Sequence, residues 1–268
     1  MVRFSQIAVF SFAGFLLAGC NLPEKDRPIW ENVKIADLAT PPRKNLDSGL
    51  LKTMNFEVYI IDIPAENIHT LDDIWLMLQT HPLHFSDYQS FRTNLFLAGF
   101  GQRRIRNTVA DLLYAGRKNI EKVSLILSDG QADEFVITRL DRQTIFYYPS
   151  RDTMEGQTVG PGKLVLRIKA EKIPGSRGVC SVNILPVFLP PIRNSIPQLA
   201  TPAISDEYIF ASVGFGLRMS PGDFVFLAPE KYIDNQITVG GLFFRSGLST
   251  KQKPFVRTYL IACNRIID

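Results

Sequence analysis

A cluster of arginines is the clearest group of side chains with binding chemistry. Arg103, Arg104 and Arg106 lie within one short segment, and Arg117 follows close behind. The planar guanidinium group binds carboxylates and phosphates through paired hydrogen bonds. The cluster therefore predicts a site for an anionic partner: a lipid headgroup, the carboxylates of a peptidoglycan stem peptide, or an acidic face of another protein. The alternative is an exposed strand edge that charge keeps soluble.

The cysteines offer a second kind of chemistry. Cys180 and Cys263 both lie inside apolar runs, where a thiol is ordinarily buried and unreactive, so neither is expected to be a nucleophile. An oxidising compartment permits a disulfide between them. Two separate thiols in the core are the alternative. The third cysteine, Cys20, has a different setting.

Cys20 follows a segment with the parts of a secretory signal. Arg3 lies in a short positive region, an apolar run extends from Ile7 to Leu17, and small residues precede the cysteine. The run is too short for a helix that spans a bilayer, which needs roughly 20 residues. Residues 1–19 are therefore predicted to be a signal peptide.

The sequence Leu17-Ala18-Gly19-Cys20 resembles the lipobox of bacterial lipoproteins. The resemblance implies cleavage after Gly19 and acylation of Cys20, whose acyl chains would hold the mature chain on a lipid bilayer. In that family an aspartate after the cysteine favours the inner membrane, but the residue here is Asn21. We therefore expect the periplasmic face of the outer membrane if the cell has two membranes.

Common catalytic and metal-binding motifs do not occur in this sequence. It has no G-x-S-x-G, S-x-x-K, H-E-x-x-H or C-x-x-C pattern. Of the three histidines, His81 and His84 are close together, but Pro82 between them prevents a shared helical face. We therefore predict no catalytic residue, no metal and no cofactor.

Composition limits the partners and the fold. The 30 basic and 26 acidic residues leave a net charge of +4, which is too mild to indicate a nucleic-acid partner. The 19 phenylalanines and 17 prolines favour a core of strands with many breaks between them.

Local patterns in the first half predict a tether and a small β-α-α-β-α module. Residues 20–49 mix prolines with charges and are expected to be the lipidated tether. The module, at 50–120, begins with a strand over residues 56–63. Its helices are predicted to begin at Thr70 and at the capping box that Ser86 opens, and over residues 108–117, with a short strand at 100–105 before the last helix.

Residues 121–268 are predicted to form a β-rich module. The Asp129-Gly130 turn is expected to join strands 123–128 and 135–140 as a hairpin. Further strands are predicted at 144–148, 163–172, 179–188, 209–219, 223–227, 238–244 and 256–266. The fold class is therefore α+β, with a mainly antiparallel sandwich or partly closed barrel in the second half.

The second half also resembles the β-domain of secretins, the outer-membrane rings of secretion and pilus systems. The resemblance lies in residues 162–168, in Met219-Ser220-Pro221-Gly222-Asp223 with the following apolar run, and in residues 240–244 and 259–267. It departs from the family in the run for membrane-inserted hairpins and in the glycine-rich turn before the last strands. The resemblance implies a place in, or beside, an envelope assembly.

Taken together, these features predict a membrane-anchored, non-catalytic accessory component of a cell-envelope assembly with an envelope protein partner. Two alternatives remain at this level: a periplasmic enzyme acting on envelope polymers without a recognisable motif, and a carrier of apolar cargo. Convergent polar groups in a pocket would favour the enzyme. An apolar patch with an arginine rim would favour the binding component, and an enclosed dry cavity would favour the carrier.

Overall fold

The computed structural model describes residues 52–115, 117, 119–150, 153–191, 207–232, 238–246 and 254–267. The predicted signal peptide, the lipobox with Cys20, and the tether lie outside these residues. Within the described part of the chain, no helix has the length and apolarity needed to cross a membrane.

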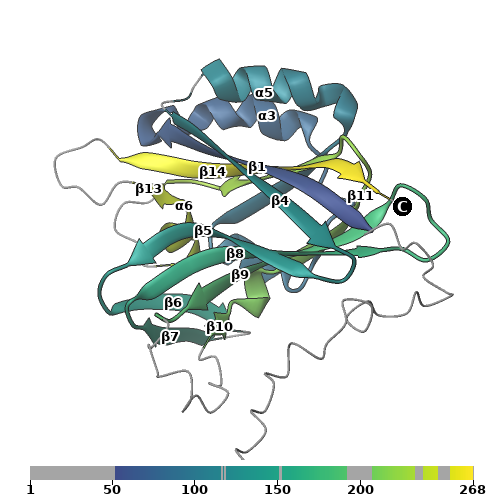
Figure 1. Ribbon diagram of the computed structural model, residues 1–268. Helices are drawn as coiled ribbons and strands as arrows, with labels where there is room; N and C mark the ends of the chain where they lie inside the picture. Colours follow the sequence, from purple (N-terminus) through teal and green to yellow (C-terminus); the bar gives the residue numbers. More distant parts are fainter. Residues whose placement is uncertain are drawn as a thin grey trace, which may run out of the picture. The chain divides into compact units, whose positions relative to one another are not determined.

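Two antiparallel sheets pack face to face, and a layer of helices covers the outer face of one of them (Figure 1). In spatial order, the first sheet contains β3 (Phe96–Gly101), β12 (Phe224–Pro229), β14 (Phe255–Ile266), β1 (Thr53–Pro64) and β4 (Asn119–Ser128), with β13 (Arg245–Ser246) paired to β14. The second contains β2 (His84–Phe85), β11 (Phe215–Met219), β9 (Cys180–Leu189), β8 (Gly162–Lys172) and β5 (Ala132–Leu140), with β10 (Tyr208–Ile209) paired to β9. A separate hairpin joins β6 (Thr144–Ser150) and β7 (Thr153–Val159).

This arrangement confirms the α+β class with mainly antiparallel sheets, and the sheets do not close into a barrel. The division predicted at residue 120 does not separate two sheets. Strands β1 and β3, from the predicted first module, lie in one sheet with β12 and β14 from the second. Residue 120 itself lies inside β4. The reason is that β1 finds its pairing partner about 200 residues away along the chain, a choice that local patterns do not encode.

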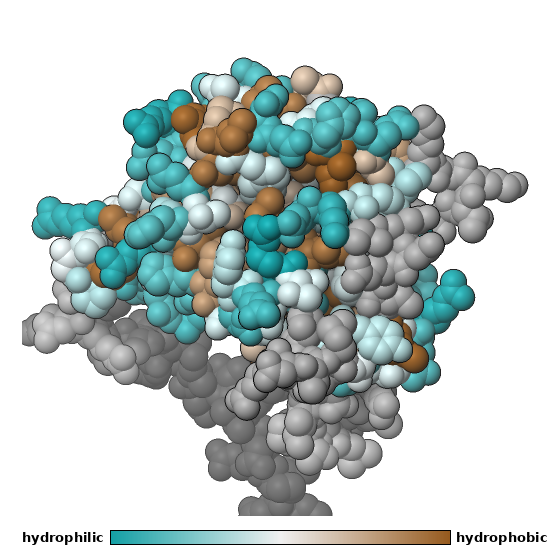
Figure 2. All heavy atoms as spheres, turned by 180° about the vertical axis from the view of Figure 1, so that it is seen from behind, coloured by the Kyte–Doolittle hydropathy of each residue, from teal (hydrophilic) through white to brown (hydrophobic). Residues whose placement is uncertain are grey.

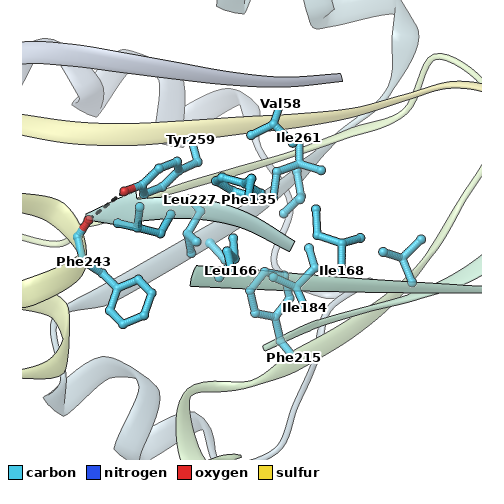
Figure 3. Packing of buried hydrophobic residues seen from close by; sticks show 14 of the residues in the cluster. Val58, Phe135, Leu166, Ile168, Ile184, Phe215, Leu227, Phe243, Tyr259 and Ile261 are labelled. Carbon is cyan, nitrogen blue, oxygen red and sulfur yellow. Dashed lines mark hydrogen bonds between the residues drawn. The ribbon is translucent and has the colours of Figure 1, made fainter. Parts of the chain in front are cut away.

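The main core fills the space between the two sheets (Figure 3). Val58 and Ile261 of the first sheet face Leu166 and Ile184 of the second, and all four side chains are fully buried. Within the described residues, close-packed side chains fill the region between the two sheets.

A second core lies between the first sheet and the helices α3 (Asp72–Met77) and α5 (Arg106–Ala115). Val109 and Leu113 of α5 pack there against Phe224 and Leu260 of the sheet. Strand β1 contributes to both cores: alternate residues from Met54 to Ile60 lie in the core between the sheets, and Ile61 and Ile63 lie in the second core. Its alternation changes at Ile60 and Ile61, which are both buried, one in each core.

Two helix starts differ from the sequence-based predictions. Thr70 does not cap α3, because a 3-10 helix (η2, Ala65–Leu71) runs directly into it and the Thr70 hydroxyl donates to the carbonyl of Asn67. At α4 (Tyr88–Thr93) the cap is Asp87 rather than Ser86, because the Asp87 carboxylate accepts from the backbone N–H of Ser90 at 3.0 Å.

Two further predictions were wrong. Residues 239–244 form the helix α6 (Val239–Phe244) instead of a strand, with Thr238 as a side-chain N-cap. The Asp129-Gly130 turn does not close a hairpin, because β4 belongs to one sheet and β5 to the other. The turn instead carries the chain between the sheets, and Gly130 supplies the positive φ of 76° that it needs.

Candidate anion-binding cleft

The predicted strand at residues 100–105 ends at Gly101, and the arginine cluster lies on helices. Arg103 begins a 3-10 turn (η3, Arg103–Ile105), and Arg106 is the first residue of α5. The alternative interpretation of these arginines as a charged strand edge is therefore wrong. Helical backbone changes which side chains share a face, since residues three apart now lie together.

Arg103 and Arg106 both line a cleft of about 640 Å³ between α5 and the outer face of the first sheet. This volume lies within the range of ordinary ligand sites. Tyr59 of β1 and Asn264 of β14 form its floor, and Pro221 and Gly222, in the turn between β11 and β12, complete its wall. Asp111 and Tyr114 of α5 lie farther along the same helix.

Arg106 is held in place by three groups of the sheet. It donates to Asn264 Oδ1 at 3.1 Å and lies 3.5 Å from the hydroxyl of Tyr59. The third group is the Glu57 carboxylate, 3.6 Å away. A guanidinium group carries five N–H donors, so this anchoring leaves donors for a ligand.

Glu57 is the centre of the network that supports Arg106. It pairs with Lys122 of β4 at 2.5 Å and accepts a hydrogen bond from Tyr59 at 2.6 Å. Burial alone would raise its pKa, but hydrogen bonds with Lys122, Tyr59 and Asn264 outweigh burial and lower the pKa of Glu57 to about 2. The carboxylate is therefore ionised throughout the physiological range. Burial and the bond to Glu57 together raise the pKa of Tyr59, so its hydroxyl keeps its proton.

Of the two arginines in the cleft, Arg103 is the one whose guanidinium group is available to bind a ligand. Its side chain is exposed, and within the described residues it makes no hydrogen bond or ion pair. The charged side chains that line the cleft are Arg103, Arg106 and Asp111, which sum to 2 − 1 = +1. Because Arg106 lies near the Glu57 carboxylate, Arg103 is the cleft arginine that forms no ion pair within the described residues.

The other two predicted arginines have different places. Arg104 is exposed and is not among the residues that line the cleft. Arg117 lies over the ring of Tyr114, with its Cζ 4.5 Å from the ring centroid. Tyr114 in turn lines the cleft and is 41% exposed. Seen from behind, the helical layer at the top mixes apolar and polar side chains (Figure 2).

Sequence reasoning missed the residues that hold Arg106. Glu57, Tyr59 and Asn264 lie in strands that the sequence presents as apolar runs, far from the arginine cluster. One signal was available: a charged residue inside a strand that is otherwise apolar and largely buried needs a partner. Asp62 follows the same rule in β1, because it pairs with Arg257 of β14 at 2.9 Å.

Another charged cluster lies on the second sheet. Arg167 of β8 donates to Glu134 at 2.6 Å and to Glu207 at 2.7 Å. Both carboxylates are thus occupied by one guanidinium group, whose hydrogen bonds also lower the pKa of Glu207. Within the described ranges, no three His, Cys, Asp or Glu side chains gather in an arrangement that could hold a metal ion.

Both predicted disulfide partners are described by the structure. Cys180 and Cys263 are buried free thiols that belong to the core between the sheets.

The structure also locates segments that resemble secretins. Residues 162–168 lie in β8, Ser220 to Asp223 form the turn between β11 and β12, and the final run is β14.

Comparisons with known proteins do not assign this chain to a family. No protein-family model matches this chain, and no curated protein matches it. Among solved structures, it is similar to the InvG secretin domain β-barrel from the Salmonella SPI-1 injectisome NC-base, with 12% identity and a TM-score of 0.27. The match covers 81% of this chain, which spans 64% of that chain's length. A TM-score this low does not indicate a shared fold, so the function proposed below depends on the cleft.

Proposed function

We propose that this chain is a lipid-anchored, non-catalytic binding component of a cell-envelope assembly, and that the cleft takes a carboxylate-bearing segment of a partner protein. The observation that carries this proposal is the position of Arg103. It is an uncommitted guanidinium group that lines a cleft of about 640 Å³, which Arg106, already fixed, also lines. Guanidinium groups suit a carboxylate ligand.

The composition of the cleft favours a protein partner. Arginine and tyrosine are among the residue types most enriched at the energetic centres of protein interfaces, and this cleft is lined by Arg103, Arg106, Tyr59 and Tyr114. Asp111 lies in the same cleft and would repel a uniformly anionic lipid surface. A protein segment with mixed charge meets no such repulsion.

The membrane anchor is the second part of the proposal, and it is supported by the signal and lipobox pattern that ends at Cys20. The alternative function, a carrier of apolar cargo, gains no support, because side chains of the described residues fill the region between the sheets. The enzyme alternative gains none either. The polar groups of the cleft are arginine, asparagine, tyrosine and one aspartate, and within the described residues no histidine or cysteine joins them.

The test is affinity purification of the tagged chain from gently solubilised envelopes in four versions. Arg103→Gln removes the available charge, and Arg104→Gln is its matched control, because Arg104 does not line the cleft. Cys20→Ser removes the anchor. We expect an envelope protein to co-purify in a stoichiometric amount with the unaltered chain and with Arg104→Gln. With Arg103→Gln, the amount recovered should be about tenfold lower, as for the loss of one charge-assisted contact.

The outcomes separate the two parts of the proposal. Equal recovery with Arg103→Gln and Arg104→Gln would exclude the cleft as the binding site. Full recovery with Cys20→Ser would remove the anchor from the proposal and leave the cleft. A chain that is purified alone in every version would contradict the accessory role altogether.

A further inference from the structure

The chain crosses from one sheet to the other through a tight four-residue turn. Met219 ends β11 in the second sheet, and Phe224 begins β12 in the first. Between them, the backbone N–H of Ser220 donates to Asp223 Oδ2 at 2.9 Å, and the N–H of Asp223 donates to the carbonyl of Ser220 at 3.0 Å. The end of β11 in one sheet and the start of β12 in the other are therefore held close together at this point.

Cys180 and Cys263 lie at opposite ends of this turn. Cys180 is paired with Met219 in the ladder between β9 and β11, and its thiol donates to the carbonyl of Met219. Cys263, in β14, donates its backbone N–H to Asp223 at 2.9 Å and accepts from Gly222 at 2.6 Å. Neither cysteine has any exposed surface, and both side chains point into the core between the sheets.

The two thiols also act on each other. The neighbouring thiol of Cys263 is the largest cause of the lowered pKa of Cys180. In return, Cys180 together with burial raises the pKa of Cys263. This agrees with the geometry. Cys180 pairs with Met219 at one end of the turn, Cys263 bonds Gly222 and Asp223 at the other, and both side chains lie in the same core.

We propose that Cys180 and Cys263 form a disulfide that joins the two sheets when the chain folds in an oxidising compartment. The oxidant is a disulfide donor of the thiol–disulfide oxidoreductase class. One of the two cysteine thiolates attacks the donor disulfide and releases one donor thiol. The other cysteine thiolate then attacks the Sγ atom of the first and releases the second donor thiol, so that two cysteines are oxidised and one donor disulfide is reduced.

Burial determines when this exchange takes place. Because both side chains are inaccessible in the folded chain, the donor must react before the core between the sheets closes. Once formed, the bridge fixes both ends of the turn at residues 220–223. Pro221 and Gly222 of that turn form a wall of the cleft, so the bridge also stiffens the cleft.

The bridge is tested on the full chain with Cys20→Ser, which leaves Cys180 and Cys263 as its thiols. The chain is refolded in mixtures of oxidised and reduced glutathione, then denatured and alkylated, and the thiols are assigned by peptide mapping. We expect neither cysteine to be alkylated after oxidative refolding, and both after reduction. Cys180→Ser and Cys263→Ser should each leave one reactive thiol and form no intramolecular bridge.

A second measurement separates a bridge favoured by the fold from accidental oxidation. The equilibrium against glutathione gives the effective concentration of one thiol at the other, in native buffer and in concentrated urea. We expect the native value to be at least about 100-fold higher, which corresponds to about 2.8 kcal/mol. Equal values, bridges only between molecules, or two reactive thiols after oxidative refolding would each overturn the proposal.

Discussion

The side chain of Arg103 lies directly against the backbone of Gly222. A Cβ atom added to Gly222 would be 2.7 to 2.8 Å from the Cβ, Cγ and Cδ atoms of Arg103, closer than real side chains approach. Gly222 also has a φ of 97°, which side chains rarely adopt. The glycine therefore makes room for the arginine that we assign to the partner's carboxylate.

Substitution of Gly222 tests this contact. Gly222→Ala should displace Arg103 and strain the turn, and we expect a loss of about 1 to 3 kcal/mol in the free energy of unfolding, measured with urea. Gly130→Ala is the matched control, because Gly130 has a φ of 76° and no atom near its Cβ position. If Gly222→Ala and Gly130→Ala lose the same free energy of unfolding and recover the same amount of partner protein, the contact with Arg103 has no effect.

The low pKa of Glu57 predicts an acid dependence of stability. Its pKa is about 2 in the folded chain against an ordinary value of 4.5, so its contribution is fully present above 4.5 and is lost as the pH falls from 4.5 to 2. We expect this contribution to be about 1 to 2 kcal/mol, because water screens a pair at this depth. Urea unfolding of the unaltered chain and Glu57→Gln between pH 2 and 7 measures it.

The difference in stability between these two chains should shrink as the pH falls, since protonation removes the charge that the substitution removes. Glu171→Gln is a suitable control, because Glu171 forms an exposed pair with Lys169. A constant difference at every pH would show that Glu57 acts by packing and not by charge.

The hydroxyl of Tyr259 should contribute measurably to the core. It donates to the carbonyl of Phe243 at 2.7 Å, and the tyrosine is 1% exposed (Figure 3). Tyr259→Phe leaves that carbonyl, at the end of α6, without this donor, so we expect a loss of about 1 to 3 kcal/mol in urea. Tyr147→Phe, at a side chain that is 49% exposed, should change stability by less than about 0.5 kcal/mol.

The proposed disulfide should make stability depend on reductant. The bridge would span 263 − 180 = 83 residues, for which the chain-entropy relation predicts about 4 to 5 kcal/mol. Urea unfolding of the oxidised chain, with and without a reductant, measures the gain. Cys180→Ser should unfold at the same midpoint in both conditions, and the same insensitivity in the unaltered chain would contradict the bridge.

Residue patterns predicted strands better than helix starts. The strands at 56–63, 163–172 and 256–266 agree with β1, β8 and β14 within a few residues, because their apolar runs are long. Residues 238–244 were misassigned because Gly240, Gly241 and the phenylalanines suit several structures. In the fold, Gly240 lies tightly against the backbone of Asn94, a packing contact that favours a short helix there and that local sequence cannot show.

The sequence by itself predicted a signal peptide and a lipobox ending at Cys20, which stay predictions, and it indicated the α+β class and the basic cluster at Arg103 to Arg106. Only the tertiary structure decided that Arg103 and Arg106 share a cleft, and that Asn264, 158 residues away from Arg106, helps to hold it. It also placed Cys180 and Cys263 at the two ends of one turn. The physical reason is that strand pairing between distant segments sets which side chains share a face, and the pattern within a segment does not specify its partner.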